Sequence, residues 1–408
     1  MPAPGRAAAA TARLLRRHWL AALYVLVAVG VAVQRLVLHK QNVFRIFSSA
    51  FHNLIAGRDI YAAHPDQYFD FFRYTPTAAL AFGPFAVVPE WLGLAAWNVC
   101  NALALYWAVR RLLPRAQAQL VLLLALGDLA RCMQSCQSNG VVTALMIAAF
   151  VAYRAERPLS GAFAVAGGAA IKIFPVGAAL FALLRRERVR ALAMVGAAAV
   201  VFFVLVPMAF IGPRELFADY GRWAAQEHAE TFKPMYSVMD LLDAWTGYFG
   251  PRLPIQLAGL TILLLPVALR PEARDDPAWR LTLLSSLLVF SVLFNYGAEP
   301  PSFVIATTGI AVWYAAGRRT PVQGVILGLT LALVTGEGLG VWPQAVRHAW
   351  MDDSRIRIIP VVAAWATMQV DLWRGRPAAE AVTEPAVEPA FVLAEEPALA
   401  ALVLDGSD

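Results

Sequence analysis

The chain has little charge for its length. Aspartate, glutamate, lysine and arginine make up 15% of its 408 residues, whereas hydrophobic residues make up 59%. Soluble domains carry about a quarter of charged residues, so this composition argues against an ordinary soluble protein. The formal net charge is +6, but most arginines flank apolar blocks instead of forming a continuous basic face. That placement argues against a nucleic-acid partner.

Cysteines are few, and internal symmetry is absent from the sequence pattern. The three cysteines are Cys100, Cys132 and Cys136. Cys132 and Cys136 lie four residues apart with no histidine or second pair nearby, which argues against a zinc site. We find no internal repeat of the kind that many transporters show, and no inserted soluble domain. We therefore expect neither a metal site nor a cofactor.

Apolar blocks fill most of the chain. Because a membrane-crossing helix needs about 20 apolar residues, the blocks predict an all-α, polytopic membrane bundle of about 11–13 helices. We expect residues 1–376 to form one integral-membrane domain, and 377–408 to form a disordered, acidic cytoplasmic tail. The first block is too long for a cleaved signal peptide. The blocks lie near residues 19–38, 76–88, 91–109, 118–133, 138–153, 159–184, 191–212, 254–269, 279–296, 302–316, 321–341 and 358–373.

Arginine placement predicts the orientation, because arginines gather on the cytoplasmic side of membrane proteins. Groups of arginines precede the first block, separate later blocks and follow the last one. Both termini are then inside, in a bacterial inner membrane. The count of crossings leaves one choice open between 76–109 and 159–184, since one crosses once and the other twice. The arginines favour a hairpin over 159–184, with Lys172 near its outer tip. The segments expected outside are 40–75, 213–253, 295–301 and 342–357.

The first outer segment carries the densest polar chemistry. Phe44, Phe47, Phe51, Leu54 and Ile55 recur at helical spacing, which predicts an amphipathic helix in the membrane interface, ended by Gly57. Carboxylates, aromatic rings and an arginine follow it. Such a mixture at a bilayer surface fits binding of a polar group attached to a lipid, and a carboxylate there is a candidate general base. These residues are Asp59, Tyr61, His64, Asp66, Tyr68, Asp70, Arg73 and Tyr74.

Three further features interrupt the apolar pattern. Gln137-Ser138-Asn139 opens a membrane helix, where its side chains either join helices or bind a substrate. Lys172 lies within an apolar stretch, where a lysine either reaches the interface or marks a functional site whose counter-charge is a lipid phosphate. The turn 295–302 contains Asn295 and a second candidate carboxylate, Glu299. Asp128 and Arg131, three residues apart on one helix, are expected to neutralise each other.

These stretches together resemble glycosyltransferase family 87, whose members are polyprenol-phosphate-mannose-dependent mannosyltransferase-like proteins of the GT-C class. The resemblance covers most of residues 15–375. The residues that carry it are the Phe-rich run 43–55 before Gly57-Arg58-Asp59-Ile60-Tyr61, Arg73-Tyr74-Thr75-Pro76-Thr77, Pro84 and Pro89 with Trp97-Asn98, Gln137-Ser138-Asn139, and Lys172-Ile173-Phe174-Pro175.

The resemblance implies an inverting transfer of a mannose-like hexose from a polyprenyl-phosphate donor to a glycan or glycolipid acceptor at the outer face. Such enzymes take their base from the first outer loop, often from an aspartate soon after the first helix. This chain has Asn42 and Val43 there. The base is then expected among Asp59, Asp66, Asp70 and Glu299, with Asp59 and Asp70 weighted about equally.

Donor binding is assigned to residues that offer charge or hydrogen bonds. Arg73 and Lys172 are expected to bind the donor phosphate, because a leaving phosphate needs cationic stabilisation. Tyr74, Gln137, Asn139 and Asn295 complete the predicted substrate-binding set. Two other functions use the same residues without a base, namely a transporter or flippase for a polyprenyl-linked glycan and a catalytically silent scaffold. A transporter needs access from both sides, whereas a transferase needs a cavity at the outer face only.

Overall fold

The protein is described from a computed structural model that covers residues 4–229, 235–248, 250–347, 351 and 353–375, with side chains from residue 18 onward except those of 227–229. Within these ranges the chain is helical and contains no strand. The α-helices are α1 (Pro4–Val37), α2 (Asn42–Ile55), α3 (Pro76–Ala81), α4 (Gly83–Ala86), α5 (Glu90–Leu112), α6 (Arg115–Gln134), α7 (Asn139–Arg154), α8 (Pro158–Ile171), α9 (Leu180–Leu183), α10 (Arg188–Val200), α11 (Val206–Met208), α12 (Pro213–Ala229), α13 (Val238–Thr246), α14 (Leu253–Leu269), α15 (Pro277–Leu293), α16 (Phe303–Ala316), α17 (Pro321–Thr330), α18 (Gly336–Gly338), α19 (Gln344–Val346) and α20 (Ile359–Arg374).

Apolar helices long enough to cross a bilayer confirm the predicted all-α membrane bundle. Six spans qualify by length and composition, and five shorter apolar helices of 10–17 residues accompany them. The six are His18–Val37, Glu90–Leu112, Arg115–Gln134, Arg188–Met208, Pro321–Gly338 and Ile356–Arg374. The fourth and fifth run through π-helical turns, η2 (Val201–Leu205) and η5 (Leu331–Thr335).

The core lies around α16, which packs against α15, α6 and α7. All residues of α16 except Tyr314 are buried, including Trp313. A helix that is apolar all round belongs at the centre of a bundle, because no face of it tolerates water. The largest hydrophobic cluster therefore joins this helix to α1, α5, α15 and α20.

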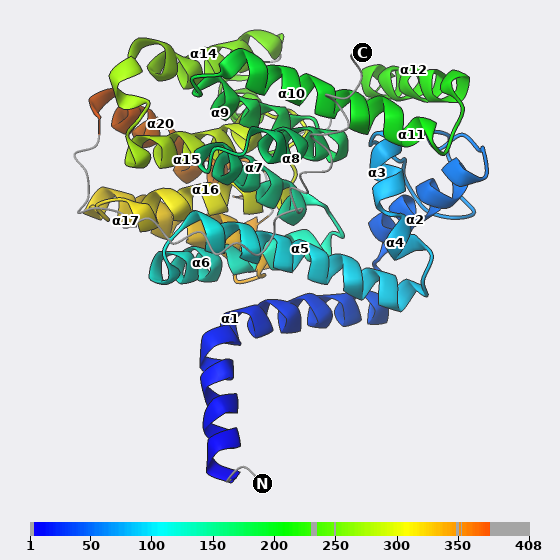
Figure 1. Ribbon diagram of the computed structural model, residues 1–408, viewed down its shortest axis with the longest axis horizontal. Coiled ribbons are helices and arrows are strands. Elements are labelled where there is room, and N and C mark those ends of the chain that lie inside the picture. Colours follow the sequence, from blue (N-terminus) through cyan, green and yellow to red (C-terminus); the bar gives the residue numbers. More distant parts are fainter. Residues whose placement is uncertain (1–3, 230–234, 249, 348–350, 352, 376–408) are drawn as a thin grey trace, which may run out of the picture.

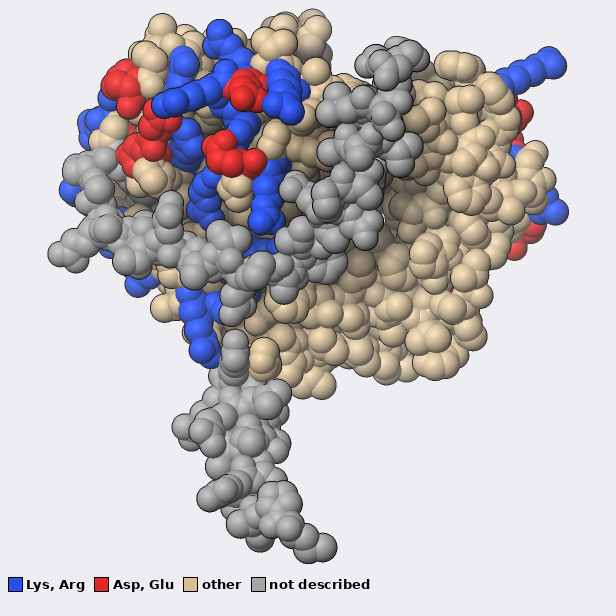
Figure 2. All heavy atoms as spheres, in the orientation of Figure 1, with Lys and Arg blue, Asp and Glu red and all other residues tan. Residues whose placement is uncertain are grey.

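The bundle has two chemically different ends. At one end α2, α3, α4, α11 and α12 gather beside the end of α1 (Figure 1). At the other end the helices α7 and α9 finish, and α10 and α15 begin, in arginine-rich turns that meet in one cavity. Figure 2 shows Lys and Arg side chains gathered toward one side of the molecule, while most of the remaining visible surface is uncharged. We call the arginine-rich side the basic end.

The predicted amphipathic helix is present as α2, and Gly57 follows it with a positive φ of 65°. Its phenylalanines pack against the protein. The rings of Phe44 and Phe47 contact Phe82, with centroids 5.2 and 5.1 Å apart, and Phe47 also lies 6.2 Å from Trp97. The apolar face of α2 thus supports a second hydrophobic cluster under the polar loop, and only Ile55 among the predicted face residues is exposed.

The two ambiguous segments differ in shape. The first contains the short helices α3 and α4, followed by the long apolar helix α5. The second is a hairpin, in which α8 runs to Lys172 and η1 (Phe174–Ala179) with α9 runs back. This shape agrees with the hairpin that the arginines favour, and the number of crossings stays a prediction. Arg185, just after α9, contacts the end of α7 and the turn before α8. It donates to the carbonyl of Tyr153 at 2.7 Å and pairs with Glu156 at 2.5 Å.

The segment 213–253, which is predicted to lie outside, contains α12 and α13. The ring N–H of Trp223 in α12 donates to the carbonyl of Arg73 at 3.3 Å, so α12 contacts the polar loop before α3. The side chain of His228 and the whole of Lys233 lie outside the described residues, as does the predicted tail 377–408.

Candidate functional site

Five of the predicted site residues come together at the end opposite the basic end. Lys172 Nζ donates to Asn139 Oδ1 at 2.8 Å and to Gln137 Oε1 at 3.3 Å. The Tyr74 hydroxyl donates to the same Gln137 oxygen at 3.0 Å, and Gln137 Nε2 donates to Glu299 Oε2 at 3.4 Å. Lys172 also lies 5.8 Å from the centre of the Tyr74 ring. We call these five residues the lysine cluster.

Lys172 lies at the tip of the hairpin because the helix stops there. It has an extended backbone, with φ −143° and ψ 139°, and Pro175 follows three residues later. Proline supplies no backbone N–H and disfavours helical continuation before it. Gly168 permits the close return of the chain, because a Cβ at this position would lie 2.9 Å from the Cβ of Pro175. Thr75 fastens the tip to the first outer loop by donating to the carbonyl of Ala170 at 2.5 Å.

Gln137 and Asn139 are positioned by the turn between α6 and α7. Cys136 has a positive φ of 52°, and the N–H of Gln137 donates back to the carbonyl of Cys132 at 3.1 Å. Asn139 is the first residue of α7 and is fully buried. Its Nδ2 donates to the carbonyl of Pro301 at 3.0 Å, which joins this turn to the turn that carries Glu299.

Glu299 precedes a short 3-10 helix, η4 (Pro300–Ser302). Asn295 shapes this turn, since its Oδ1 accepts from the N–H of Gly297 at 3.0 Å and its carbonyl accepts from the N–H of Ala298 at 3.1 Å. Asn295 thus has a positioning role in the structure, and its place in the substrate-binding set stays a prediction. Glu299 itself is partly exposed, as are Tyr74, Gln137 and Lys172.

Arg73 lies beside the lysine cluster in the sequence but engages a different partner. Its guanidinium pairs with Asp70 at 2.9 Å, and both side chains are partly exposed. Asp70 has a φ of 88°, in the region that non-glycine residues rarely adopt, and its Oδ1 also accepts from the N–H of Phe71 at 2.9 Å. The structure therefore makes Asp70 and Arg73 a local pair.

Asp59 lies in a separate acidic group with residues of α12. Arg222 reaches Asp59 at 3.4 Å and Asp219 at 2.6 Å, and it also contacts Glu215. Burial raises the pKa of Asp219, and the contact with Arg222 opposes that rise. Asp59 also accepts from the N–H of Tyr61 at 2.8 Å. Within the part of the chain described, no hydrogen bond or ion pair joins Asp59 or Asp70 to the lysine cluster.

The electrostatics of the lysine cluster fit an anionic ligand. The ammonium of Lys172 is held by two neutral amide oxygens, and no carboxylate among the described residues lies within ion-pair distance of it. Burial raises the pKa of Tyr74, helped by the nearby charge of Glu299, so its hydroxyl stays protonated and can donate. Lys172 thus offers a cation to an anion, and Tyr74 offers a hydroxyl donor. The carboxylate of Glu299 is connected to both through the side-chain amide of Gln137.

A buried ionic group near the same end escaped the sequence prediction. Glu337 accepts from Arg357 at 3.0 Å and also pairs with Arg347 at 3.5 Å and with Arg131 at 3.8 Å. Asp128 instead accepts a hydrogen bond from Thr335 at 2.6 Å. The charge of Arg131 still acts on Asp128, as expected, but the ion pair of this arginine is with Glu337. No local spacing could have indicated a partner 206 residues away in the sequence.

Comparison with known proteins assigns the chain to one family. No curated protein matches the chain. The family model of glycosyltransferase family 87 matches residues 71–295, which is more than half of the chain and spans Arg73, Tyr74, Gln137, Asn139, Lys172 and Asn295. The chain, an integral membrane protein by its apolar helices, therefore belongs to glycosyltransferase family 87.

Proposed function

We propose that this glycosyltransferase moves a mannose-like hexose from a polyprenyl-phosphate donor to a hydroxyl of a glycan or glycolipid, with inversion at the anomeric carbon. The observation that carries the proposal is the environment of Lys172. A cation held only by neutral amide oxygens, at the tip of an apolar hairpin, fits the phosphate of a lipid-linked donor. A helical bundle of the GT-C kind fits the same donor, and the described residues form no nucleotide-sugar domain.

The reaction needs one base and one stabilised leaving group. The acceptor hydroxyl gives its proton to a carboxylate as its oxygen bonds the anomeric carbon. The bond from that carbon to the phosphate oxygen breaks, and polyprenyl phosphate leaves with the electron pair. Lys172 and the Tyr74 hydroxyl supply the cation and the donor that stabilise the charge on the departing phosphate.

We propose Glu299 as the base. It shares Gln137 with Lys172 and Tyr74, so a sugar whose phosphate contacts Lys172 has this carboxylate nearby. Of the other three predicted bases, Asp59 and Asp70 are engaged by Arg222 and Arg73 respectively, and Asp66 is exposed in the polar loop. A base must lie within hydrogen-bond reach of the proton that it removes, and Glu299 is the predicted carboxylate with a contact to the cluster.

The proposed orientation follows from the two ends of the bundle. We propose that the basic end faces the cytoplasm of a bacterial cell and that the lysine cluster faces outward. The arginine-rich turns 185–190 and 270–280 support this orientation, since cytoplasmic loops carry the excess of lysine and arginine.

The decisive experiment is sugar transfer by purified protein from radiolabelled polyprenyl-phosphate mannose to candidate acceptors. We expect Glu299→Gln to lower the transfer rate by about 100- to 10,000-fold, as loss of a general base does, while donor binding persists. Asp59→Asn and Asp70→Asn are expected to retain more activity. Asp353→Asn, an exposed carboxylate on the same predicted side, is the control for charge loss.

The outcomes separate the alternatives. If Glu299→Gln transfers sugar at the wild-type rate while Asp59→Asn or Asp70→Asn loses activity, the base is a carboxylate of the first outer loop. Donor binding by the wild type without transfer to any acceptor, together with lipid movement across vesicles, would favour a flippase. The anomeric configuration of the product tests inversion directly.

A further inference from the structure

A cavity at the basic end stands apart from the lysine cluster. Its volume is about 240 Å³, well above the roughly 10–15 Å³ that one water molecule needs. It opens between the end of α7, the end of α9 and the start of α15. It is lined by Phe150, Tyr153, Arg154, Glu156, Phe181, Leu184, Arg185, Arg186, Glu187, Asp275 and Arg280. We call it the arginine cavity.

The carboxylates of the arginine cavity already have partners. Glu156 pairs with Arg185 at 2.5 Å, and Asp275 pairs with Arg280 at 3.0 Å. Glu187 pairs at 3.2 Å with Arg190, which lies outside the lining. Four arginines thus line the cavity against three carboxylates, and one of those carboxylates is neutralised from outside.

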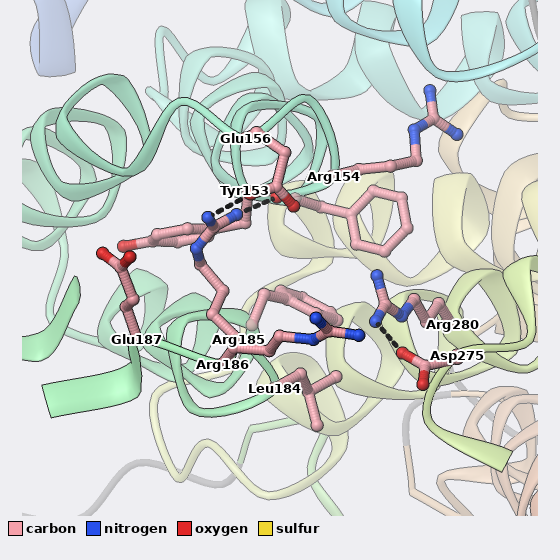
Figure 3. A pocket seen from close by; sticks show the side chains of 11 residues that line it. Tyr153, Arg154, Glu156, Leu184, Arg185, Arg186, Glu187, Asp275 and Arg280 are labelled. Carbon is pink, nitrogen blue, oxygen red and sulfur yellow. Dashed lines mark hydrogen bonds and ion pairs between the residues drawn. The ribbon is translucent and has the colours of Figure 1, made fainter. Parts of the chain in front are cut away.

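Of the other two lining arginines, Arg154 donates to the carbonyl of Arg111 at 3.4 Å, which leaves Arg186. No described carboxylate lies within ion-pair distance of it, and its side chain is exposed to the opening. Figure 3 shows the guanidinium groups of Arg186 and Arg280 pointing toward one another across the cavity. Arg185 also keeps a donor, since its Nε is buried without an acceptor. Like charges that face each other repel unless an anion lies between them.

The depth of the arginine cavity matches a lipid headgroup. It lies where the apolar helices α7, α9 and α15 begin or end, which is the level of the membrane surface. Phe150, Phe181 and Leu184 form an apolar wall, and Leu183 and Val189 next to it are exposed. A phospholipid fits both parts of the cavity, because its acyl chain can contact the apolar wall and its charged phosphate can contact the arginines.

The arginine cavity is also distant from the lysine cluster. Asn139 begins α7 at the lysine cluster, and Arg154 ends the same helix at the cavity. At 1.5 Å per residue the helix separates them by roughly 22–24 Å. A ligand in the cavity therefore cannot be a sugar donor bound at Lys172.

We propose that the arginine cavity binds the phosphate of an anionic phospholipid from the membrane leaflet at the basic end. Arg186 and Arg280 hold the phosphate from two sides, and Arg185 orders the wall through Glu156 and the Tyr153 carbonyl. A soluble phosphate offers the same charge without the acyl chain, so the test compares both sources. The inference does not depend on the reaction at the lysine cluster.

The test is ligand binding to the full chain purified in a neutral detergent. The probes are short-chain phosphatidylglycerol, the zwitterionic phosphatidylcholine of equal chain length, glycerol phosphate and inorganic phosphate. We expect phosphatidylglycerol to bind more tightly than the other three. The double variant Arg186→Gln/Arg280→Gln should weaken that binding by at least about tenfold, since contacts between charged groups and phosphate are among the stronger hydrogen bonds.

Controls keep the result interpretable. Arg318→Gln removes one exposed arginine at the same end, after α16, and should leave the affinity unchanged. If the double variant unfolds, the single variant Arg186→Gln still tests the site, because Arg186 has no described partner whose loss would disturb the fold. Equal affinity of wild type and Arg186→Gln, or of the two lipids, would overturn the proposal. Inorganic phosphate binding as tightly as phosphatidylglycerol would overturn the lipid assignment.

Discussion

At the scale of a single residue, Lys172 tests whether the protein binds the phosphate of a lipid-linked donor. Its ammonium is satisfied by Asn139 and Gln137 without a carboxylate at contact distance. Lys172→Met should weaken binding of polyprenyl-phosphate mannose by about 10- to 150-fold, the range for a hydrogen bond to a charged group. Arg73→Met should weaken it less, because Asp70 already holds that guanidinium. The measurement is donor affinity in detergent, with melting temperature recorded alongside.

The matched control for Lys172 is Lys40. It is exposed and lies in the loop between α1 and α2, on the same predicted side of the membrane. Lys40→Met removes the same charge without touching the lysine cluster, so its donor affinity should equal that of the wild type. An equal loss in both variants would mean that a general surface charge, and no specific phosphate site, attracts the donor.

Single residues also show which parts of the candidate site could be predicted from the sequence. Tyr74, Gln137, Asn139, Lys172 and Glu299 could be singled out one by one, because polar groups in apolar surroundings are costly and need a reason. Their meeting could not be predicted, since it depends on four segments that lie far apart in the sequence. The same limit explains the weight given to Asp59 and Asp70, which lie in the polar loop but contact Arg222 and Arg73 instead.

Asn42 shows a similar limit. It stands where related proteins often place an aspartate, and its side chain makes two hydrogen bonds with the backbone of Phe69. Its Nδ2 donates to that carbonyl at 2.5 Å, and its Oδ1 accepts from that N–H at 2.8 Å. An ionised aspartate could accept a hydrogen bond but could not donate one. The amide of Asn42 can do both, so it connects α2 to the polar loop. Only the folded loop reveals this role.

At the scale of an element, the hairpin of α8, η1 and α9 determines where Lys172 lies. Gly168→Ala places a Cβ 2.9 Å from the Cβ of Pro175, an atom in a rigid ring. We expect this overpacking to destabilise the protein by about 1–3 kcal/mol and to weaken donor binding, because the hairpin tip must move. Thermal unfolding in detergent and donor affinity measure the two effects.

Gly196→Ala is the control for that substitution. This glycine lies in α10, and a Cβ there meets no atom within 4 Å. Alanine should therefore leave donor binding unchanged and stabilise the helix by roughly 0.5–1 kcal/mol. If Gly168→Ala behaves like Gly196→Ala, the close approach to Pro175 does not fix the tip.

Elements were predictable where their signals are local. The Phe periodicity gave α2, the glycines with Pro175 suggested the break after α8, and the long apolar blocks gave the crossing helices. What periodicity cannot say is which partner covers an apolar face. For α2 that partner is the ring cluster of Phe82 and Trp97, which the sequence does not distinguish from lipid.

At the scale of the whole molecule, the separation of the two ends makes the orientation testable. Ala63 is exposed in the polar loop before α3, and Glu187 is exposed at the arginine cavity. If the basic end faces the cytoplasm, a membrane-impermeant thiol reagent added to intact cells should label Ala63→Cys and not Glu187→Cys. The electrostatic reason is the excess of arginine in the turns of the basic end, which favours their retention on the cytoplasmic side.

The wild-type chain, with its three native cysteines, supplies the background for this labelling experiment. Cys132 and Cys136 are buried and Cys100 is partly buried, so the wild type should give a low background. Permeabilised cells supply the positive control, because both introduced cysteines should then react. Labelling of Glu187→Cys but not Ala63→Cys in intact cells would show that the orientation in the membrane is the reverse of the one proposed. The lysine cluster would then face the cytoplasm, and the proposed transfer at the outer face would fail even if Lys172 binds a phosphate.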